Sequence, residues 1–165
     1  MNIVLIGFMG SGKSTVGRLL SEYLRCDFYD LDELILDKTK CSSISEIFDK
    51  IGEDYFREIE RNIFVNLFNS ESSIISTGGG IITNNNVLDE VKYKSQIIYL
   101  ETDLDIIKKR ISNFTDRPLF KNPKEIQNLF EHRKPFYEKF ANLKINTNLL
   151  NPQNVVDEII NFLKN

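Results

Sequence analysis

The chain has 165 residues, the size of a single domain with a sizeable hydrophobic core. Hydrophobic residues make up 41% of it and charged residues 27%, which is the composition of an ordinary globular protein rather than a disordered chain. The net charge of −3 argues against broad binding to nucleic acid or to a membrane surface. Any bound anion must therefore meet a few placed arginines and lysines.

Cysteine usage and hydrophobic runs indicate the compartment. Cys26 and Cys41 are too few for a disulfide framework and lack the spacing of metal ligands, so we expect reduced thiols. The apolar run at the N-terminus is too short for a signal peptide and has no basic flank. No stretch approaches the length of a membrane span. These features predict a cytoplasmic protein.

The N-terminal part of the chain predicts a phosphate-binding loop. Residues 2–6 are apolar and indicate a buried strand, and the next nine residues read GFMGSGKST. An amphipathic helix is predicted over 15–24, so the strand–loop–helix context of such a loop is present. The pattern G-x-x-x-x-G-K-[ST] is satisfied by Gly7, Gly12, Lys13 and Ser14.

Phosphate chemistry explains this composition. Glycines at positions 7, 10 and 12 let backbone N–H groups come close to a phosphate chain. The helix that follows favours an anion at its N-terminus. Lys13 is placed to reach the β- and γ-phosphates, and the Ser14 hydroxyl is placed to ligate Mg²⁺. The motif therefore predicts a bound nucleoside triphosphate.

Two carboxylates stand at the end of the second predicted strand, which covers residues 27–31. Asp30 and Asp32 stand at i and i+2. One is suited to hold Mg²⁺, directly or through water, and the other to orient the hydroxyl that attacks phosphorus. In the alternative interpretation, Asp32 caps a helix that begins near Glu33. The neighbouring phosphate loop favours the first interpretation.

Two helices are predicted between the second and third strands. Ser43 and Glu46 match a capping box for a short helix near 44–50. The stretch 52–69 is amphipathic, and its apolar stripe should pack on the sheet. That stripe consists of Phe56, Ile59, Ile63 and Leu67.

The third strand is predicted over 73–77, and the glycine triplet 78–80 follows it directly. Such a triplet is usually a turn, but at a strand end facing the phosphate loop it also lets the backbone approach a substrate and offer N–H donors. Further strands are predicted over 96–100 and 143–147, and an amphipathic helix over 151–165 closes the chain. This alternation indicates an α/β fold whose parallel sheet is flanked by helices and binds ligands at the carboxyl ends of its strands.

Three arginines are candidates for anion binding, and a fourth is a candidate for contact with the nucleotide base. Arg57 and Arg133 are each suited to a two-pronged contact with a substrate carboxylate. The alternative for Arg57 is a surface ion pair with Glu60, one turn further along its helix. Arg117 stands in a polar, proline-punctuated stretch and is suited to stabilise a transferring phosphoryl group. Arg110 either stacks on an adenine ring or is solvated.

Together these residues resemble the shikimate kinase family nearly end to end. Six stretches carry the resemblance, in order and at matching spacing: GFMGSGKST, FYDLDELI, IFDKIGEDYFREIE, STGGG, DRPLF and HRKPFYE. It implies ATP-dependent phosphorylation of the 3-hydroxyl of shikimate, giving shikimate 3-phosphate and ADP in aromatic amino-acid biosynthesis. It also implies a P-loop fold like that of nucleoside-monophosphate kinases, with five parallel strands in the order 2-3-1-4-5 and a mobile lid. Residues 1–165 are then one kinase domain, with a substrate-binding region at about 32–62 and the lid at about 113–123.

The resemblance also implies roles for individual residues. The residues implied to bind ATP are Gly10, Ser11, Gly12, Lys13, Ser14, Thr15, Arg110, Arg117 and Pro152. The residues implied to bind shikimate are Asp32, Phe48, Phe56, Arg57, Glu60, Gly78, Gly79, Gly80 and Arg133. The implied catalytic residues are Lys13, Asp32 and Arg117. Ser14 and Asp30 are implied to serve the Mg²⁺ cofactor, and the expected partners are small molecules only, bound by a monomer.

One position departs from the family pattern, and two alternatives stay open. Some relatives carry an arginine near the adenine where this chain has Leu150, so we expect the backbone around Asn151 and Pro152 to contact the base. The first alternative is another small-molecule kinase on the same fold, such as a gluconate or nucleoside-monophosphate kinase. The second is a non-catalytic ATP-binding module, which the presence of Asp32, Arg117 and Arg133 disfavours.

Overall fold

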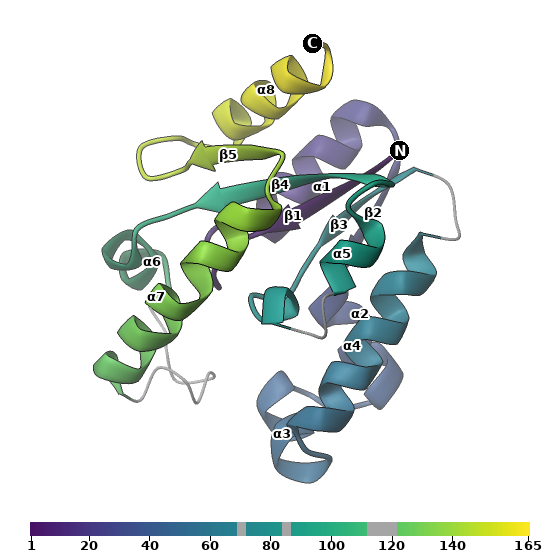
Figure 1. Cartoon of the computed structure of the whole chain (residues 1–165), viewed down its shortest axis with the longest axis vertical. Helices are drawn as coiled ribbons and strands as arrows, with labels where there is room; N and C mark the ends of the chain where they lie inside the picture. The colour runs from purple at the N-terminus through teal and green to yellow at the C-terminus, as the bar shows by residue number, and fades with distance from the viewer. Residues whose placement is uncertain (69–71, 84–86, 112–121) are drawn as a thin grey trace.

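A five-stranded parallel sheet forms the centre of the molecule (Figure 1). The structure is a computed structural model that describes residues 1–68, 72–83, 87–111 and 122–165. The strand order is β2-β3-β1-β4-β5, as the resemblance predicted. The strands are β1 (Asn2–Ile6), β2 (Asp27–Asp30), β3 (Ser73–Ser76), β4 (Ser95–Glu101) and β5 (Leu143–Asn146).

Helices cover both faces of this sheet, so the predicted α/β class is confirmed. Helices α1 and α8 pack on one face, and α4, α5 and α7 on the other. In chain order the helices are α1 (Lys13–Leu24), α2 (Leu31–Thr39), α3 (Ile44–Lys50), α4 (Glu53–Leu67), the 3₁₀ turn η1 (Ile81–Thr83), α5 (Val87–Val91), α6 (Leu104–Arg110), α7 (Pro123–Phe140) and α8 (Pro152–Leu163).

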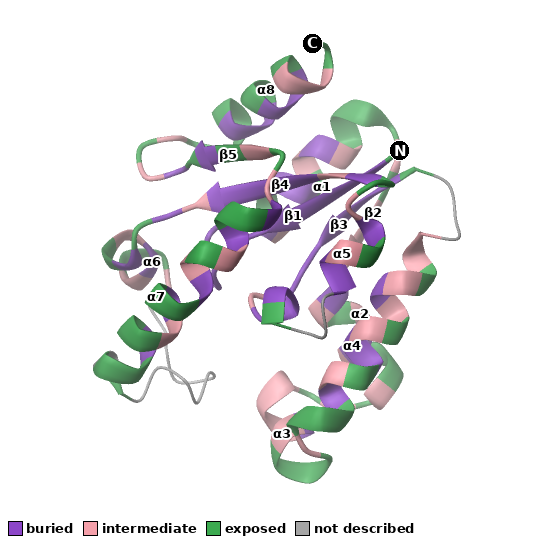
Figure 2. Ribbon diagram, in the orientation of Figure 1, coloured by how far each residue is buried: buried purple, intermediate pink, exposed green. Residues whose placement is uncertain are grey.

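The core has two halves because β1 is buried on both faces (Figure 2). Val4 and Ile6 join the cluster beneath α4 and α7, whereas Ile3 and Leu5 join the cluster beneath α1 and α8. A continuous apolar strand is what a parallel sheet covered by helices requires. Among the described residues, no helix combines the length and apolar character needed to cross a membrane.

Strand register places the functional segments at one edge of the sheet. Asp30 at the end of β2 lies beside Ser76 at the end of β3, and Ser76 lies beside Leu5 of β1. The phosphate loop after β1, the acidic residues after β2 and the glycine turn after β3 therefore leave the sheet side by side. The carboxyl edge of a parallel sheet is where ligands bind in such folds.

The apolar stripe predicted for α4 packs against the core: Phe56 and Ile59 are buried, and Ile63 and Leu67 are partly buried against the same cluster. Glu60 of this helix is fully buried as well, which the apolar pattern did not predict. The capping box predicted for α3 needs correction, because it is only half formed. Ser43 accepts the Glu46 N–H as predicted, but the Glu46 carboxylate turns to the backbone N–H and hydroxyl of the preceding Ser42.

Candidate active site

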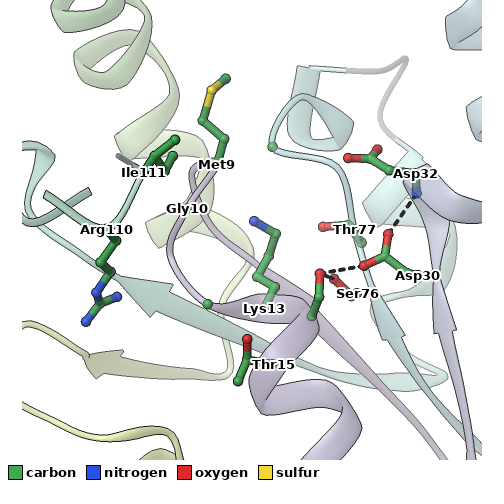
Figure 3. Close-up of a pocket in the computed structure, with 13 residues that line it drawn as sticks. Met9, Gly10, Lys13, Thr15, Asp30, Asp32, Ser76, Thr77, Arg110 and Ile111 are labelled. Atoms are coloured by element: carbon green, nitrogen blue, oxygen red, sulfur yellow. Dashed lines mark hydrogen bonds between the residues drawn. The ribbon is translucent and has the colours of Figure 1, made fainter. Parts of the chain in front are cut away.

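The phosphate loop lines a pocket of about 370 Å³ (Figure 3). Gly10 and Gly12 have φ of 76° and 97°, a backbone conformation that residues with a side chain rarely adopt. The ammonium group of Lys13 donates to the carbonyls of Gly7 at 2.9 Å and Phe8 at 3.0 Å, so the side chain folds back over the loop. Of the predicted loop residues, Gly10, Gly12, Lys13, Ser14 and Thr15 line the space in which a phosphate chain would lie, and Ser11 lines a neighbouring pocket.

Asp30 connects the phosphate loop to the second strand. Its Oδ2 accepts the Ser14 hydroxyl at 2.5 Å, and the Ser14 and Ser76 hydroxyl oxygens lie 3.4 Å apart. Its Oδ1 accepts the backbone N–H groups of Asp32 and Glu33, so Asp30 is the N-cap of α2. The alternative in which Asp32 caps this helix is therefore wrong. Asp32 stands in the first turn and lines the pocket instead.

These donors fit a magnesium ion. Mg²⁺ takes oxygen ligands, and in kinases it uses only one or two protein groups because substrate phosphates and water complete its shell. The Ser14 hydroxyl and the Asp30 carboxylate supply two such oxygens beside the phosphate loop. Among the described residues there is no cluster of three His, Cys, Asp or Glu side chains, which is the set that an all-protein metal site would need.

A second pocket, of about 380 Å³, adjoins the first. Met9, Asp32 and Gly79 line both pockets, so Asp32 stands at their junction. The wall of the second pocket includes an edge-to-face aromatic pair, Phe48 and Phe56, whose ring centroids are 4.9 Å apart. The structure thus brings together all of the residues predicted to bind shikimate: Asp32, Phe48, Phe56, Arg57, Glu60, Gly78, Gly79, Gly80 and Arg133.

Arg57 is held in this pocket by two carboxylates of its own helix. Its Nη1 donates to Glu60 at 2.8 Å and its Nη2 to Glu53 at 3.1 Å. The alternative of a surface ion pair is wrong, because Glu60 is fully buried and the side chain of Arg57 is only 19% exposed. Burial disfavours the charged form, but the charges of Glu60 and Glu53 outweigh burial, so the pKa of Arg57 is raised.

Arg133 is the other cation of the pocket. It is 8% exposed and belongs to a buried stripe of α7 that is otherwise apolar or aromatic. Burial, with a smaller contribution from the nearby Arg57 charge, lowers its pKa below the ordinary arginine value. Within the described part of the chain, its Nε is buried without a hydrogen-bond partner. A buried guanidinium of this kind is suited to an anion in the pocket.

The glycine triplet makes room for three different side chains. A Cβ on Gly78 would lie 2.8 Å from Asp32 Oδ1, and one on Gly80 would lie 2.7 Å from Arg57 Nη2. A Cβ on Gly79 would lie 3.2 Å from the Met9 backbone nitrogen and 3.5 Å from Arg133 Nη1. The three glycines themselves are absent from the positive-φ positions, so they are required for space rather than for an unusual backbone conformation.

A smaller pocket of about 240 Å³ lies on the other side of the phosphate loop. Ser11, Arg110, Leu150 and Pro152 are among the residues that line it. The Arg110 guanidinium donates to the Thr147 carbonyl at 2.6 Å, so it is not simply solvated, and stacking on an adenine ring stays a prediction. The largely apolar lining of this pocket and its position next to the phosphate loop are suited to a nucleotide base.

Some predictions fall outside the described residues, and some lining residues were not predicted. Arg117 and most of the stretch 113–123 lie outside the described part of the chain. Met9, Thr77 and Tyr137 were not predicted, although Met9 lines both pockets and Thr77 lines the first. For Tyr137 a signal was present: it is four residues after Arg133 and so lies on the same face of α7.

Fold and site together define a P-loop phosphotransferase. The 370 Å³ pocket lined by the phosphate loop is the nucleotide pocket, and the adjoining 380 Å³ pocket, which holds Arg57 and Arg133, is the acceptor pocket. The carboxylate of Asp32 stands where these two pockets join. This arrangement can place a phosphoryl donor beside an anionic acceptor.

Comparison with known proteins identifies the family. The sequence profile described as shikimate kinase matches residues 9–164. The chain is 43% identical to the shikimate kinase of Sulfurihydrogenibium sp. (strain YO3AOP1) over 99% of this chain and 98% of that protein. It superposes on the crystal structure of shikimate kinase from Aquifex aeolicus with a TM-score of 0.88 and 41% identity, covering 99% of this chain and 96% of the other.

A third comparison involves a liganded relative. The shikimate kinase of Acinetobacter baumannii in complex with shikimate gives a TM-score of 0.91 at 33% identity, covering 98% of this chain and 92% of the other. The chain therefore belongs to the shikimate kinase family, whose enzymes transfer a phosphoryl group from ATP to shikimate in aromatic biosynthesis.

Proposed function

We propose that this chain transfers the γ-phosphoryl group of ATP to the 3-hydroxyl of shikimate, giving shikimate 3-phosphate and ADP. The observation that carries this proposal is the position of Asp32 at the junction of the nucleotide pocket and the pocket that holds Arg57 and Arg133. The Asp32 carboxylate therefore lies between a phosphoryl donor in the nucleotide pocket and an acceptor in the other pocket. The two arginines hold that acceptor by the acceptor's carboxylate group.

On the nucleotide side, the loop from Gly10 to Thr15 wraps the phosphates with its N–H groups. Lys13 leaves its carbonyl partners to pair with the β- and γ-oxygens. Ser14 and Asp30 would hold Mg²⁺, which when bound neutralises charge on the same oxygens. Arg110 and Pro152 border the base. Leu150 borders it as well, so base contacts there are apolar.

On the acceptor side, Arg57 and Arg133 bind the carboxylate of shikimate. Their binding energy fixes the ring and so serves to orient the hydroxyl rather than to activate it. Phe48 and Phe56 pack against the ring, and Glu60 keeps Arg57 in place. Asp32 accepts the proton of the 3-hydroxyl while the oxygen of that hydroxyl attacks the γ-phosphorus. ADP leaves with the β–γ bridging oxygen.

The remaining parts of the proposal rest on the family resemblance. Arg117 adds positive charge at the transferring phosphoryl group, in a lid at about 113–123 that keeps water from the reaction. The chain acts as a single kinase domain and as a monomer in the cytoplasm, with ATP and shikimate as its small-molecule partners and no nucleic-acid or membrane partner. The substrate-binding region is about 32–62.

Product analysis tests this function. The protein is incubated with MgATP and shikimate, and the product is examined by phosphorus and proton NMR. We expect one phosphate ester whose phosphorus couples to the ring proton at C3, with one ADP formed per ester. A phosphate at another ring position would contradict the arrangement of Asp32 opposite the two arginines. Chelation of Mg²⁺ with EDTA should abolish turnover, and added Mg²⁺ should restore it.

A further inference from the structure

The glycine turn after β3 is fixed by its three carbonyl groups. Those of Gly78 and Gly80 accept N–H groups three residues further along the turn, at 3.3 and 3.0 Å. The Gly79 carbonyl instead accepts the hydroxyl of Tyr137 at 2.5 Å, from a residue 58 positions away. Among the described hydrogen bonds of these carbonyls, this is the one that ties the turn to another element, helix α7.

Tyr137 is itself held rigidly. It is 1% exposed, and its ring stacks on that of Tyr99 in β4, with centroids 5.1 Å apart and an angle of 22° between the planes. Burial raises the pKa of its hydroxyl, so the group stays protonated and remains a donor at any working pH. Because packing fixes the position of the Tyr137 side chain, the hydrogen bond also fixes the position of the glycine turn.

The geometry of the peptide bond gives this contact a consequence. A trans peptide is planar, and its C=O and N–H groups point in opposite directions. Fixing the carbonyl of Gly79 therefore also fixes the direction of the N–H of Gly80. Both glycines line the acceptor pocket. Arg133 approaches Gly79 as well, because its Nη1 lies 3.5 Å from the position that a Cβ on Gly79 would occupy.

We propose that Tyr137 is a positioning residue for the acceptor. Its hydroxyl holds the Gly79–Gly80 peptide in one orientation, and it keeps the turn in register with Arg133, one helical turn back on α7. One helix thereby sets both the arginine and the backbone of the acceptor pocket. This role rests on the proposed function, because it concerns the same substrate.

The test compares Tyr137→Phe with Tyr99→Phe. The first removes the hydroxyl and keeps the ring stack, and the second removes a hydroxyl from the other ring of that stack. For each variant we measure kcat and KM for shikimate and for ATP, together with the melting temperature. We expect Tyr137→Phe to raise the shikimate KM roughly five- to tenfold, because the Gly79 carbonyl loses its buried partner. The ATP KM should stay within about twofold of the wild-type value, and Tyr99→Phe should leave both constants unchanged.

The outcomes separate the possible failures. An unchanged shikimate KM in Tyr137→Phe, with or without a lower melting temperature, would mean that the hydroxyl serves packing only and would overturn the role. An equal rise in both KM values would overturn it as well, because it would indicate general loosening. If the wild-type protein itself does not turn over shikimate, the proposed function fails, and this role fails with it.

A second measurement needs no variant and covers the case in which Tyr137→Phe does not fold. In wild-type protein labelled at tyrosine and glycine, shikimate should shift the resonances of Tyr137, Gly79 and Gly80 together. Gluconate at the same concentration serves as the control. A shift of the glycine amides without any response of Tyr137 would contradict the coupling.

Discussion

Asp30 and Asp32 stand two residues apart at the end of β2, and Oδ1 of Asp30 accepts the backbone N–H of Asp32 at 3.1 Å. One aspartate therefore builds the helix start that positions the other. Asp30 uses its second oxygen for Ser14, whereas Asp32 lines both the nucleotide pocket and the acceptor pocket. This division of roles separates the metal side of the reaction from the acceptor side.

Replacement of Asp32 by Asn should depress kcat far more than ATP affinity. The amide keeps the size of the side chain but accepts a proton poorly, so we expect a loss of roughly a hundredfold or more in kcat. ATP affinity, measured by titration calorimetry, should change by less than about threefold. Glu33→Gln is the matched control, since Glu33 is the next residue and pairs with Arg18 on the surface. Comparable losses of kcat and ATP affinity would refute the acceptor role of Asp32.

Replacement of Arg133 by Ala should weaken shikimate binding without destabilising the fold. Loss of one partner of a buried charge pair costs a few kcal/mol, so the shikimate KM should rise about a hundredfold. Without shikimate, the Arg133→Ala variant no longer buries an arginine charge, so the melting temperature of the variant should equal or exceed that of the wild type. Lys134→Ala, on the adjacent and more exposed position of α7, is the control. A shikimate KM equal to that of the wild type would rule out the carboxylate contact.

Alanine at the glycine triplet should have effects that differ by position. Gly80→Ala places a Cβ against the Arg57 guanidinium and should raise the shikimate KM, whereas Gly78→Ala displaces the Asp32 carboxylate and should mainly lower kcat. Both side chains are flexible at their ends, so the fold should persist. The measurement is steady-state kinetics with both substrates. Identical kinetic defects in the two variants would contradict the assignment of separate neighbours.

The stability of α3 should depend on pH through Glu46. Hydrogen bonds from Lys50 and Ser42 lower the pKa of this carboxylate to about 2. The charged form is favoured in the folded protein, so its contribution is present above the ordinary pKa of 4.5 and is lost as the pH falls toward about 2. Carbon-detected NMR titration of Glu46 should show this value. The stability difference between wild type and Glu46→Gln should shrink over the same range and in 1 M salt, because the group is at the surface. Titration of Glu46 near 4.5 would contradict this account.

The phosphate loop and the sheet could be predicted from the sequence because their signals are local. The loop is encoded in nine consecutive residues, and β1, β3 and β4 contain apolar runs that are followed by loop residues. The strand order itself came from the resemblance to a family. Alternation alone does not fix which strands are neighbours.

The details that escaped prediction depend on contacts between distant segments. The pattern of α4 alone allowed Glu60 to be a surface ion-pair partner, and only the family resemblance placed it at the substrate pocket; its burial beside the glycine turn comes from a distant segment. The N-cap of α2 shifted by two residues because β2 ends at Asp30, and strand ends are decided by pairing with β3. The spacing from Arg133 places Tyr137 on the same face of α7, but its contact with the Gly79 carbonyl, 58 positions away, could not be predicted from a local pattern.

Acceptor selectivity is the sharpest test of shikimate as the phosphoryl acceptor. ADP release from MgATP is measured with shikimate, with gluconate, with AMP and with no acceptor, for the wild-type protein and for Asp32→Asn. We expect rapid ADP release with shikimate only, and near-complete loss of that release in Asp32→Asn. ADP release that is equal with all acceptors, or that is faster with gluconate or AMP, would contradict an acceptor pocket built for shikimate. Binding of ATP without release of ADP under any condition would instead indicate a non-catalytic nucleotide-binding module.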